Sequence, residues 1–361
     1  MKLEEMCTVF TDGDWIESKD QSDEGIRLIQ TGNIGEGTYL DKGTRAKYIS
    51  EDTFKKLKCT QVYSGDILVS RLPEPVGRAC IIPEKEESMI TAVDCTICRP
   101  DESIVSKEYL CYFMRSNAYY TRLLSGITGT TRKRISRKNL GNIELDIPSK
   151  KEQKKVVKQL DYLVKVVDLR KQELVALDNL IKARFVEMFY DKGYSAFKWN
   201  DVFNTTTGKL DSNAAVENGE YPFFTCSKEI LRIDEFAFDQ EALLLAGNNA
   251  AGKYDVKYYN GKFNAYQRTY VLGLKENWSY QLFRYQLEDK LVYLQRQSLG
   301  GLTKYLTMKI LGELDFIIPP MEKQIEFEEF AKQVDKSKVV VSANIVYNIK
   351  RIKTEFINYY F

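Results

Sequence analysis

The sequence contains no histidine among its 361 residues. Histidine is the commonest general base and the usual partner of serine and cysteine nucleophiles, so these catalytic systems and histidine-containing metal sites are excluded. Long apolar runs are also lacking, because no segment approaches the roughly 18–20 residues that cross a membrane. The N-terminal stretch is acidic and does not resemble a secretion signal. We therefore expect a cytoplasmic protein with no membrane partner.

Cysteine is sparse and scattered along the chain. Seven cysteines occur, at positions 7, 59, 80, 95, 98, 111 and 226. Only Cys95 and Cys98 are close together, and a zinc site would need a second such pair. The segment around them reads as a strand, in which residues three apart face opposite sides. We expect buried thiols, with no disulfides and no metal site.

Charge is unevenly distributed, although the formal net charge is only +2. Residues 1–24 hold eight acids against Lys2 and Lys19, whereas residues 109–138 hold seven basic residues and no acid. Five of these seven lie in residues 132–138, directly after the glycine-threonine loop "SGITGTT". A basic run is often only a solvated face, but positive charge on a loop is also what a phosphate backbone attracts.

The stretch "LLLAGNNAAGKYD" (243–255) nearly matches the phosphate-binding loop of nucleotide hydrolases. That loop needs Ser or Thr after its lysine and a helix behind it. Here Tyr254 follows Lys253, and the next segment reads as a strand, a turn at Asn260–Gly261 and a second strand. We therefore predict a tight glycine turn between strands. A nucleotide-dependent enzyme remains the weaker alternative, since it depends on residues 247–253 alone.

The chain contains an internal repeat. "GTTRKRISRKNLGNIELDIPSKKEQ" (129–153) matches "GGLTKYLTMKILGELDFIIPPMEKQ" (300–324) at a constant offset without a gap. More loosely, residues 25–34 match 219–228, residues 65–82 match 241–256, and residues 91–96 match 264–269. Gly77-Arg78 then stands where Gly252-Lys253 stands. This correspondence predicts, in both halves, a turn that brings a positive side chain to the surface.

A long helical pattern follows the proline of each repeat. Steps of four and three residues give mostly apolar positions, which is the heptad signature of coiled-coil pairing. The alternative is two amphipathic helices packed on separate cores. Each helix would have about 40 residues and a length of ~55–60 Å. The seam positions are Val156, Leu160, Leu163, Val167, Arg170, Leu174, Leu177, Ile181, Arg184 and Met188, and then Phe327, Ala331, Val334, Lys338, Val341, Ile345, Asn348, Ile352, Glu355 and Tyr359.

The order of domain, proline and long helix, present twice, resembles the specificity subunit of a Type I restriction-modification system. The resemblance covers essentially the whole chain. It is carried by the two "L-G-x-[IL]-x-[LF]-x-[IV]-P" to "Q" junctions, by "IRLIQTGNI", by "GDILVSR" with "VGR", and by "LLLAGNNAAGK". At the second junction Lys323-Gln324 replaces Glu152-Gln153, so the capping acid is missing and the start of the second helix is less well defined.

The resemblance implies an α+β protein with a pseudo-two-fold internal repeat. Two globular mixed α/β target recognition domains (1–149 and 191–319) would be joined by two long antiparallel helices (150–190 and 320–361) that form a coiled coil. Each domain would read one half of a bipartite, asymmetric site in double-stranded DNA. The helices would set the half-site spacing and dock methyltransferase subunits, two of which are expected; restriction subunits are left open as further partners.

The same resemblance implies that this chain has no catalysis and no cofactor of its own. S-adenosylmethionine would bind the methyltransferase partner, and ATP with magnesium would serve the restriction partner. A coiled-coil scaffold without sequence-specific DNA reading is the alternative, but it does not explain two elaborated, divergent domains. The DNA sequence that is recognised is left open.

Candidate DNA-binding residues follow from the chemistry of nucleic-acid recognition. Base edges are read by Arg, Lys, Asn, Gln, Ser and Thr, while phosphates mainly attract Arg and Lys. The candidates in the first half are Gln30, Thr31, Asn33, Arg71, Arg78, Arg132, Lys133 and Arg134, and those in the second half are Ser227, Lys228, Asn248, Asn249, Lys253 and Lys304.

Overall fold

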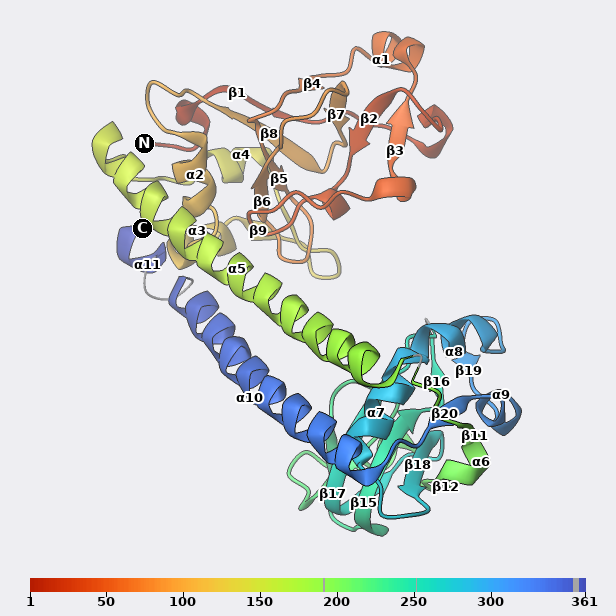
Figure 1. Cartoon of the computed structure of the whole chain (residues 1–361). Coiled ribbons are helices and arrows are strands. Elements are labelled where there is room, and N and C mark those ends of the chain that lie inside the picture. The colour runs from red at the N-terminus through yellow and green to blue at the C-terminus, as the bar shows by residue number, and fades with distance from the viewer. Residues whose placement is uncertain (191, 251, 353–356) are drawn as a thin grey trace. The chain divides into compact units, whose positions relative to one another are not determined.

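The computed structural model describes residues 1–190, 192–250, 252–352 and 357–361 (Figure 1). The chain divides into two compact units. Unit 1 comprises Met1–Gln172 and Ser342–Phe361, and unit 2 comprises Glu173–Val341. Each unit therefore combines a globular part with segments of both long helices, α5 (Lys150–Phe189) and α10 (Met321–Arg351).

Unit 1 contains two four-stranded sheets. The first has the strand order β1-β8-β5-β6 and is antiparallel throughout, and the second has the order β3-β2-β7-β4 with β2 parallel to β7. The strands are β1 (Cys7–Asp12), β2 (Ile26–Ile29), β3 (Lys47–Ile49), β4 (Gln61–Val62), β5 (Ile67–Ser70), β6 (Ala79–Ile81), β7 (Met89–Thr91), β8 (Cys95–Pro100), β9 (Ile127–Thr128) and β10 (Arg134–Ile135). The helices of the globular part are α1 (Glu51–Leu57), α2 (Lys107–Phe113), α3 (Asn117–Leu124) and α4 (Arg137–Gly141), and α11 (Ile357–Tyr360) lies near the C-terminus.

The central strands of unit 1 are apolar on both faces. Ile67 and Val69 of β5 pack with the helices, whereas Leu68 faces the opposite side and packs with residues of the second sheet. Successive side chains of a strand point to opposite faces, so one short run serves two cores. Cys95 and Cys98 of β8 divide in the same way between these two cores. All seven cysteines are free thiols; five are buried, as predicted, whereas Cys7 and Cys226 are half-buried.

Unit 2 is built around one six-stranded sheet with the order β12-β18-β15-β17-β13-β14. The strands of the whole unit, including the separate pairs β11-β20 and β16-β19, are β11 (Ala196–Lys198), β12 (Phe203–Thr207), β13 (Tyr221–Phe224), β14 (Leu231–Ile233), β15 (Phe238–Ala246), β16 (Asn248–Asn249), β17 (Val256–Ala265), β18 (Thr269–Leu274), β19 (Lys304–Tyr305) and β20 (Asp315–Ile317). Its short helices are α6 (Trp199–Val202), α7 (Tyr280–Asp289), α8 (Leu291–Gln297) and α9 (Met308–Gly312). Leu243 and Leu245 of β15 face the core that holds α7 and α8, and Leu244 faces the other side.

The internal repeat is confirmed by strand pairing. The antiparallel series β1-β8-β5-β6 of unit 1 recurs in unit 2 as β12-β18-β15-β17. The parallel pair β2 and β7 recurs as β13 and β17, with Ile29 opposite Thr91 and Phe223 opposite Asn264. These are the residues that the sequence alignment places in register. The two halves therefore share a topology although their sequences have diverged.

One detail of the predicted second half is wrong. The turn expected at Asn260–Gly261 does not occur, because β17 continues through both residues. An Asn-Gly pair closes a hairpin only when its two flanking segments pair with each other. Here both flanks pair with β15, and Gly261 lies opposite Gln240. The chain instead reverses at residues 266–268, between β17 and β18.

The two long helices pair with each other, as the heptad pattern predicts. Helix α5 has 40 residues and α10 has 31. Every described seam position is buried or half-buried, while Glu355 and the side chain of Tyr359 lie outside the described residues. In unit 2, Asp178 pairs with Lys338 at 2.8 Å and Arg184 pairs with Glu326 at 2.6 Å. Residue numbers rise along one helix as they fall along the other, so the paired segments are antiparallel.

A buried glutamine joins the start of each long helix to its own unit. The side-chain oxygen of Gln153 accepts a hydrogen bond from the backbone N–H of Ser106, which caps α2, at 2.9 Å. Gln324 does the same with Ser279, which caps α7, also at 2.9 Å. Each glutamine amide donates to the carbonyl of the preceding proline, Pro148 or Pro319.

The expected loss of the acidic cap therefore does not leave the second helix undefined. The first helix begins with a box in which Ser149 and Glu152 bond reciprocally. The second begins at Met321 without that box. Gln324 is only 1% exposed and its backbone N–H also bonds the carbonyl of Pro320. The glutamine side chain thus performs the anchoring in both repeats.

Replacing Gln324 by leucine should destabilise the protein by about 1–3 kcal/mol, because the change leaves the Ser279 N–H and the Pro319 carbonyl buried without partners. The measurement is urea unfolding of the full chain. Gln333→Leu, at an exposed position of the same helix, is the matched control and should change stability by no more than about 0.5 kcal/mol. Equal losses in the two variants would contradict the anchoring role.

Candidate nucleic-acid interface

The turn after β2 carries three of the predicted DNA-binding residues. Gln30 and Thr31 are half-buried, and Asn33 is 4% exposed. The Asn33 side chain accepts from the backbone N–H of Gln30 at 3.0 Å and donates to the carbonyl of Leu40 at 2.9 Å. Asn33 therefore shapes the turn from inside, and the side chains of Gln30 and Thr31 remain available beside a surface hollow.

Arg78 fastens this turn to the rest of unit 1. It is 8% exposed, and its guanidinium donates to four backbone carbonyls. Two of these belong to Thr31 and Ile34, at 2.8 and 2.7 Å. The remaining two are those of Leu72 and Pro75. A buried charge requires such partners, and here they are provided entirely by the backbone.

The expectation that the glycine-basic pair brings a charge to the surface in both halves is wrong for Arg78. Gly77 has φ +84°, and a Cβ on it would lie 2.2 Å from a methyl carbon of Leu123. The turn directs Arg78 inward, where it holds loops and does not face a ligand. At the equivalent place in unit 2, Gly252 has φ +64° and Lys253 is exposed. Only the second half presents the charge.

Four arginines and two aspartates gather where β1 and β5 end and where β8 and β10 begin. Arg71 is 4% exposed, donates to the carbonyl of Val93 at 2.6 Å and pairs with Asp12 at 3.2 Å. Burial lowers the pKa of Arg71, and the Asp12 carboxylate opposes this effect. Arg71 thus supports the surface from beneath, and its burial favours a structural role over the predicted direct DNA contact.

The remaining arginines of this group lie at the surface. Arg134 pairs with Asp94 at 3.3 Å, and Arg132 approaches the same carboxylate at 3.9 Å. Arg137, which sequence reasoning missed, approaches Asp12 at 3.8 Å. Lys133 is exposed on the same loop. The basic residues outnumber the acids, so this edge of unit 1 carries the positive surplus that a phosphate backbone attracts.

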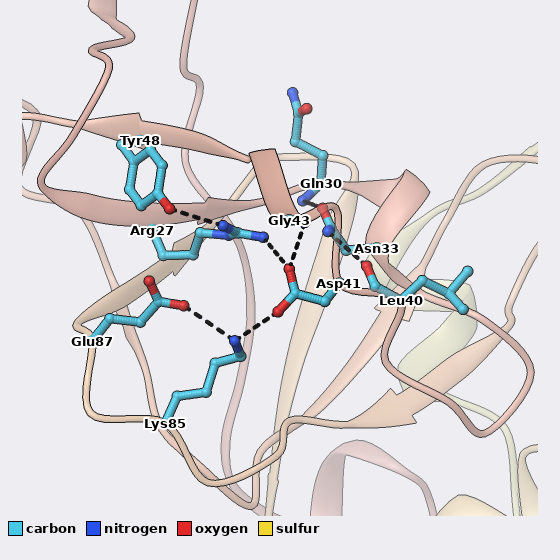
Figure 2. A network of polar contacts seen from close by, with 9 residues as sticks. All are labelled: Arg27, Gln30, Asn33, Leu40, Asp41, Gly43, Tyr48, Lys85 and Glu87. Carbon is cyan, nitrogen blue, oxygen red and sulfur yellow. Dashed lines mark hydrogen bonds and ion pairs between the residues drawn. The ribbon is translucent and has the colours of Figure 1, made fainter. Parts of the chain in front are cut away.

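A hollow of about 330 Å³ lies beside the turn that contains Gln30 and Thr31. Three basic residues that sequence reasoning missed line it, namely Lys42, Arg45 and Lys47. They occur within six residues that include Gly43, a density of basic residues that could have signalled them. Their loop is held by Asp41, whose carboxylate accepts from Arg27, Lys85 and the Gly43 N–H (Figure 2).

The candidates of unit 2 other than Ser227 and Lys228 lie near the end of β15. Asn248 and Asn249 form β16, which pairs with β19 so that Asn249 lies opposite Lys304. The backbone N–H of Lys253 bonds the side-chain oxygen of Asn249 at 3.3 Å. Strand β17 follows the Gly247–Lys253 segment, as predicted, in the place where a phosphate loop would have a helix. Ala251, within that segment, lies outside the described residues.

Arg268 connects the two candidate loops of unit 2. Its carbonyl accepts from the Gly247 N–H at 2.8 Å and from the Cys226 thiol at 3.4 Å. The loop with Ser227 and Lys228 therefore lies beside the Asn248 loop. The Arg268 side chain is exposed. Sequence reasoning missed this residue, although it lies within residues 264–269, which match residues 91–96 in the repeat.

An equivalent backbone hydrogen bond lies at the candidate surface of each unit. In unit 1 the Ile135 N–H bonds the carbonyl of Arg71, and in unit 2 the Leu306 N–H bonds the carbonyl of Gly247. The side chains around this shared bond differ, because unit 1 has Arg71 where unit 2 has glycine. The two surfaces are equivalent in position and different in chemistry.

The described ranges contain neither a metal-binding cluster nor a helix suited to cross a membrane. No three His, Cys, Asp or Glu side chains in those ranges are grouped so that they could hold a metal ion. In the same part of the chain, no helix has the length and apolar character required to cross a membrane.

Comparison with known proteins points to one family. The family model for the Type I restriction modification DNA specificity domain matches residues 1–179 and 191–351. The chain is 37% identical over 127 residues to the Type I restriction enzyme EcoDI specificity subunit of Escherichia coli, covering 34% of this chain and 27% of that protein. It is 30% identical over 206 residues to the putative type I specificity subunit S.MpnORF365P of Mycoplasma pneumoniae (strain ATCC 29342 / M129 / Subtype 1), covering 53% of this chain and 74% of that protein.

Two solved structures share the fold along almost the entire chain. One comes from work on complex assembly and conformational transition of the type I R-M system, with a TM-score of 0.59 at 15% identity over 99% of this chain and 97% of that one. The other is the type I restriction-modification system S subunit from M. genitalium, with a TM-score of 0.50 at 13% identity over 98% and 96%. They confirm the predicted fold class of two mixed α/β domains with paired long helices.

Arg78 and Lys253 occupy equivalent positions in the repeat but should respond differently to substitution. Arg78→Ala removes a buried donor from four carbonyls and should lower the free energy of unfolding by about 2–3 kcal/mol. Lys253→Ala, at an exposed position, should lower it by no more than about 0.5 kcal/mol. Both values come from urea unfolding of the full chain. An equally stable Arg78→Ala variant would overturn the structural role of Arg78.

Proposed function

The chain belongs to the family of Type I restriction-modification DNA specificity subunits, and from this premise we propose that it selects the DNA sequence for a methyltransferase or restriction complex. One observation carries the proposal. The two units present equivalent surfaces with different side chains, as the exposed Arg134 and Tyr305, which occupy matched positions of the repeat, illustrate. That arrangement suits two readers of different half-sites. Each unit then binds one half of a bipartite, asymmetric site in double-stranded DNA.

Unit 1 contributes the exposed arginines around Asp94, together with Gln30 and Thr31. Arginine can form two hydrogen bonds to guanine, and glutamine can do so to adenine. Unit 2 contributes Asn248 and Asn249, with Lys253, Lys304 and Arg268 supplying positive charge. Asparagine is the other residue that pairs with adenine. Ser227 and Lys228 stay predictions as additional contacts of unit 2.

The long helices are the proposed docking surface for methyltransferase subunits. In unit 1, Tyr162 of α5 and Val346 of α10 are 68% and 67% exposed. In unit 2, Val175 of α5 and Val339 of α10 are 60% and 69% exposed. Large apolar side chains gathered on exposed helices mark interaction surfaces. We expect two methyltransferase subunits, and restriction subunits are left open as further partners.

Catalysis is assigned to those partners. S-adenosylmethionine would be bound by the methyltransferase subunits, and ATP with magnesium would be used by the restriction subunit. This chain offers no histidine, and the Gly247–Lys253 segment is followed by Tyr254 where a nucleotide-binding loop has Ser or Thr. The competing function is a scaffold that holds partners through its coiled coil without reading DNA. Sequence-specific DNA binding separates the two.

The direct test is co-expression of this chain with its methyltransferase partner in a host without DNA methylation. Sequencing should reveal a methylated motif made of two short half-sites separated by a nonspecific gap. Methylation without a defined motif would support the scaffold. Methylation that does not require this chain would reject the proposed function.

Exchange of residues 1–149 for another recognition domain should change one half of the methylated motif and leave the other half unchanged. The reason is that the globular part of unit 1 has its own sheets and cores and needs none of the loops of unit 2. The motif is read by sequencing of the host genome. A change in both half-sites would show that the two domains do not read independently.

Lengthening both helices should widen the gap between the half-sites. Four residues inserted after Gln172 and four after Val341, at the boundaries between the units, leave the packing within each unit unchanged. They add ~6 Å and a rotation of ~40°, and a base pair adds ~3.4 Å and ~34–36°. We therefore expect a gap that is longer by about one to two base pairs.

The matched control inserts two residues at the same places. It adds half the length but turns the helix by ~200°, which should abolish methylation. Both insertions are checked by the methylated motif of the variant complex. An active four-residue variant with an unchanged gap would show that the helices do not set the spacing.

A further inference from the structure

Unit 1 has a loop that unit 2 lacks. Strands β2 and β3 pair with Leu28 opposite Lys47, and their counterparts β13 and β14 pair with Pro222 opposite Arg232. The connection between β2 and β3 has 17 residues, and the one between β13 and β14 has six. The additional residues of unit 1 therefore extend from an otherwise shared hairpin.

The long loop is held in one conformation by a charged network (Figure 2). Asp41 pairs with Arg27 at 3.0 Å and with Lys85 at 2.8 Å, and it also accepts from the Gly43 N–H at 3.0 Å. Arg27 is 3% exposed and donates in addition to the hydroxyl of Tyr48 at 3.1 Å. A buried guanidinium requires a partner. These bonds tie the loop to strand β2 beneath it.

The basic residues that follow Asp41 in the loop take no part in this network. Lys42, Arg45 and Lys47 line the hollow with Gln30 and Thr31, and no acidic residue lines it. Arg45 and Lys47 are exposed. Within the described part of the chain, none of the three basic residues forms an ion pair. Lys42 lies over the turn, since a Cβ on Gly32 would be 3.8 Å from its ammonium nitrogen.

We propose that this loop is a DNA-backbone clamp specific to unit 1. Lys42, Arg45 and Lys47 bind phosphates that flank the first half-site. Asp41 is a positioning residue that makes no DNA contact. The alternative is a solvated basic face, which would not require an aspartate anchored between a buried arginine and a lysine from a distant loop. The inference rests on the proposed function and predicts that the two units contribute unequally to salt-dependent affinity.

The test uses the assembled methyltransferase and a DNA duplex that carries its methylated motif. Each phosphate contact contributes about 0.9 to the slope of log affinity against log salt concentration. Lys42→Ala, Arg45→Ala and Lys47→Ala should each lower the magnitude of that slope by about this amount and weaken binding at every salt concentration measured. The methylated motif should stay the same, because phosphates carry no sequence information.

Lys55→Ala and Lys56→Ala are the matched controls. These lysines are exposed on α1 of the same unit and do not line the hollow. They should leave the slope at the wild-type value. A slope that falls equally in all five variants, or in none, would overturn the clamp while leaving the proposed function intact. Failure of the wild-type complex to bind its motif in a salt-dependent manner would reject the proposed function itself.

The direction in which Asp41→Asn changes DNA affinity distinguishes a positioning role from simple electrostatic attraction. The change removes a negative charge, so attraction alone predicts tighter DNA binding. Loss of the bonds to Arg27 and Lys85 predicts weaker binding with a smaller salt slope, which is the outcome we expect. Asp23→Asn, at an exposed acid of the same unit, controls for charge and should not weaken binding. Tighter binding by Asp41→Asn would overturn the positioning role.

Discussion

The buried side chain of one glutamine in each repeat is the interaction on which the arrangement within each unit depends. Its amide lies between the last proline of the globular part and the N-cap serine of the domain's own helix. Because that amide bonds fixed backbone groups on both sides, it sets the direction in which the long helix leaves the unit. Tyr112 adds a second bond in unit 1, to Asp161 on the next part of α5, at 2.7 Å. The helix is thus oriented by buried polar contacts as well as by apolar packing.

Two buried arginines of unit 1 are stabilised in different ways, and each holds a surface loop in place. Among the described residues Arg78 pairs with no acid and bonds to backbone carbonyls alone, so it holds the turn after β2. Arg27 is paired with Asp41, so it holds the long hairpin loop. Both arginines lie beneath a surface formed by the half-buried Gln30 and Thr31 and by the basic residues of the hollow. The interior charges give these loops a fixed shape, and the exposed charges are left for a ligand.

The two units show how one scaffold accommodates different recognition surfaces. Both units share the sheet order. They also share the backbone hydrogen bond from the N–H of Ile135 or Leu306 to the carbonyl of Arg71 or Gly247, which follows β5 or β15. In unit 1, Asp94 pairs with two arginines. In the matching segment of unit 2, residues 264–269, Arg268 is itself exposed. Asp94 and Arg268 lie outside the strands, where a substitution does not disturb the sheet. A repeated fold can therefore read two unrelated half-sites.

The sequence by itself determined the repeat, the two long helices and the family, because each depends on periodicity or on the order of short motifs. The seam positions needed only the spacing of apolar residues along a helix. The tertiary structure decided where individual side chains point. Arg78 is turned inward by a glycine with positive φ, and the Asn260–Gly261 turn is absent because both flanks pair with β15. The hollow beside Gln30 depends on Lys85, which is distant in sequence from Asp41. Contacts between residues far apart in the chain leave no periodic signal, so the direction and partners of these side chains were determined by the folded structure alone.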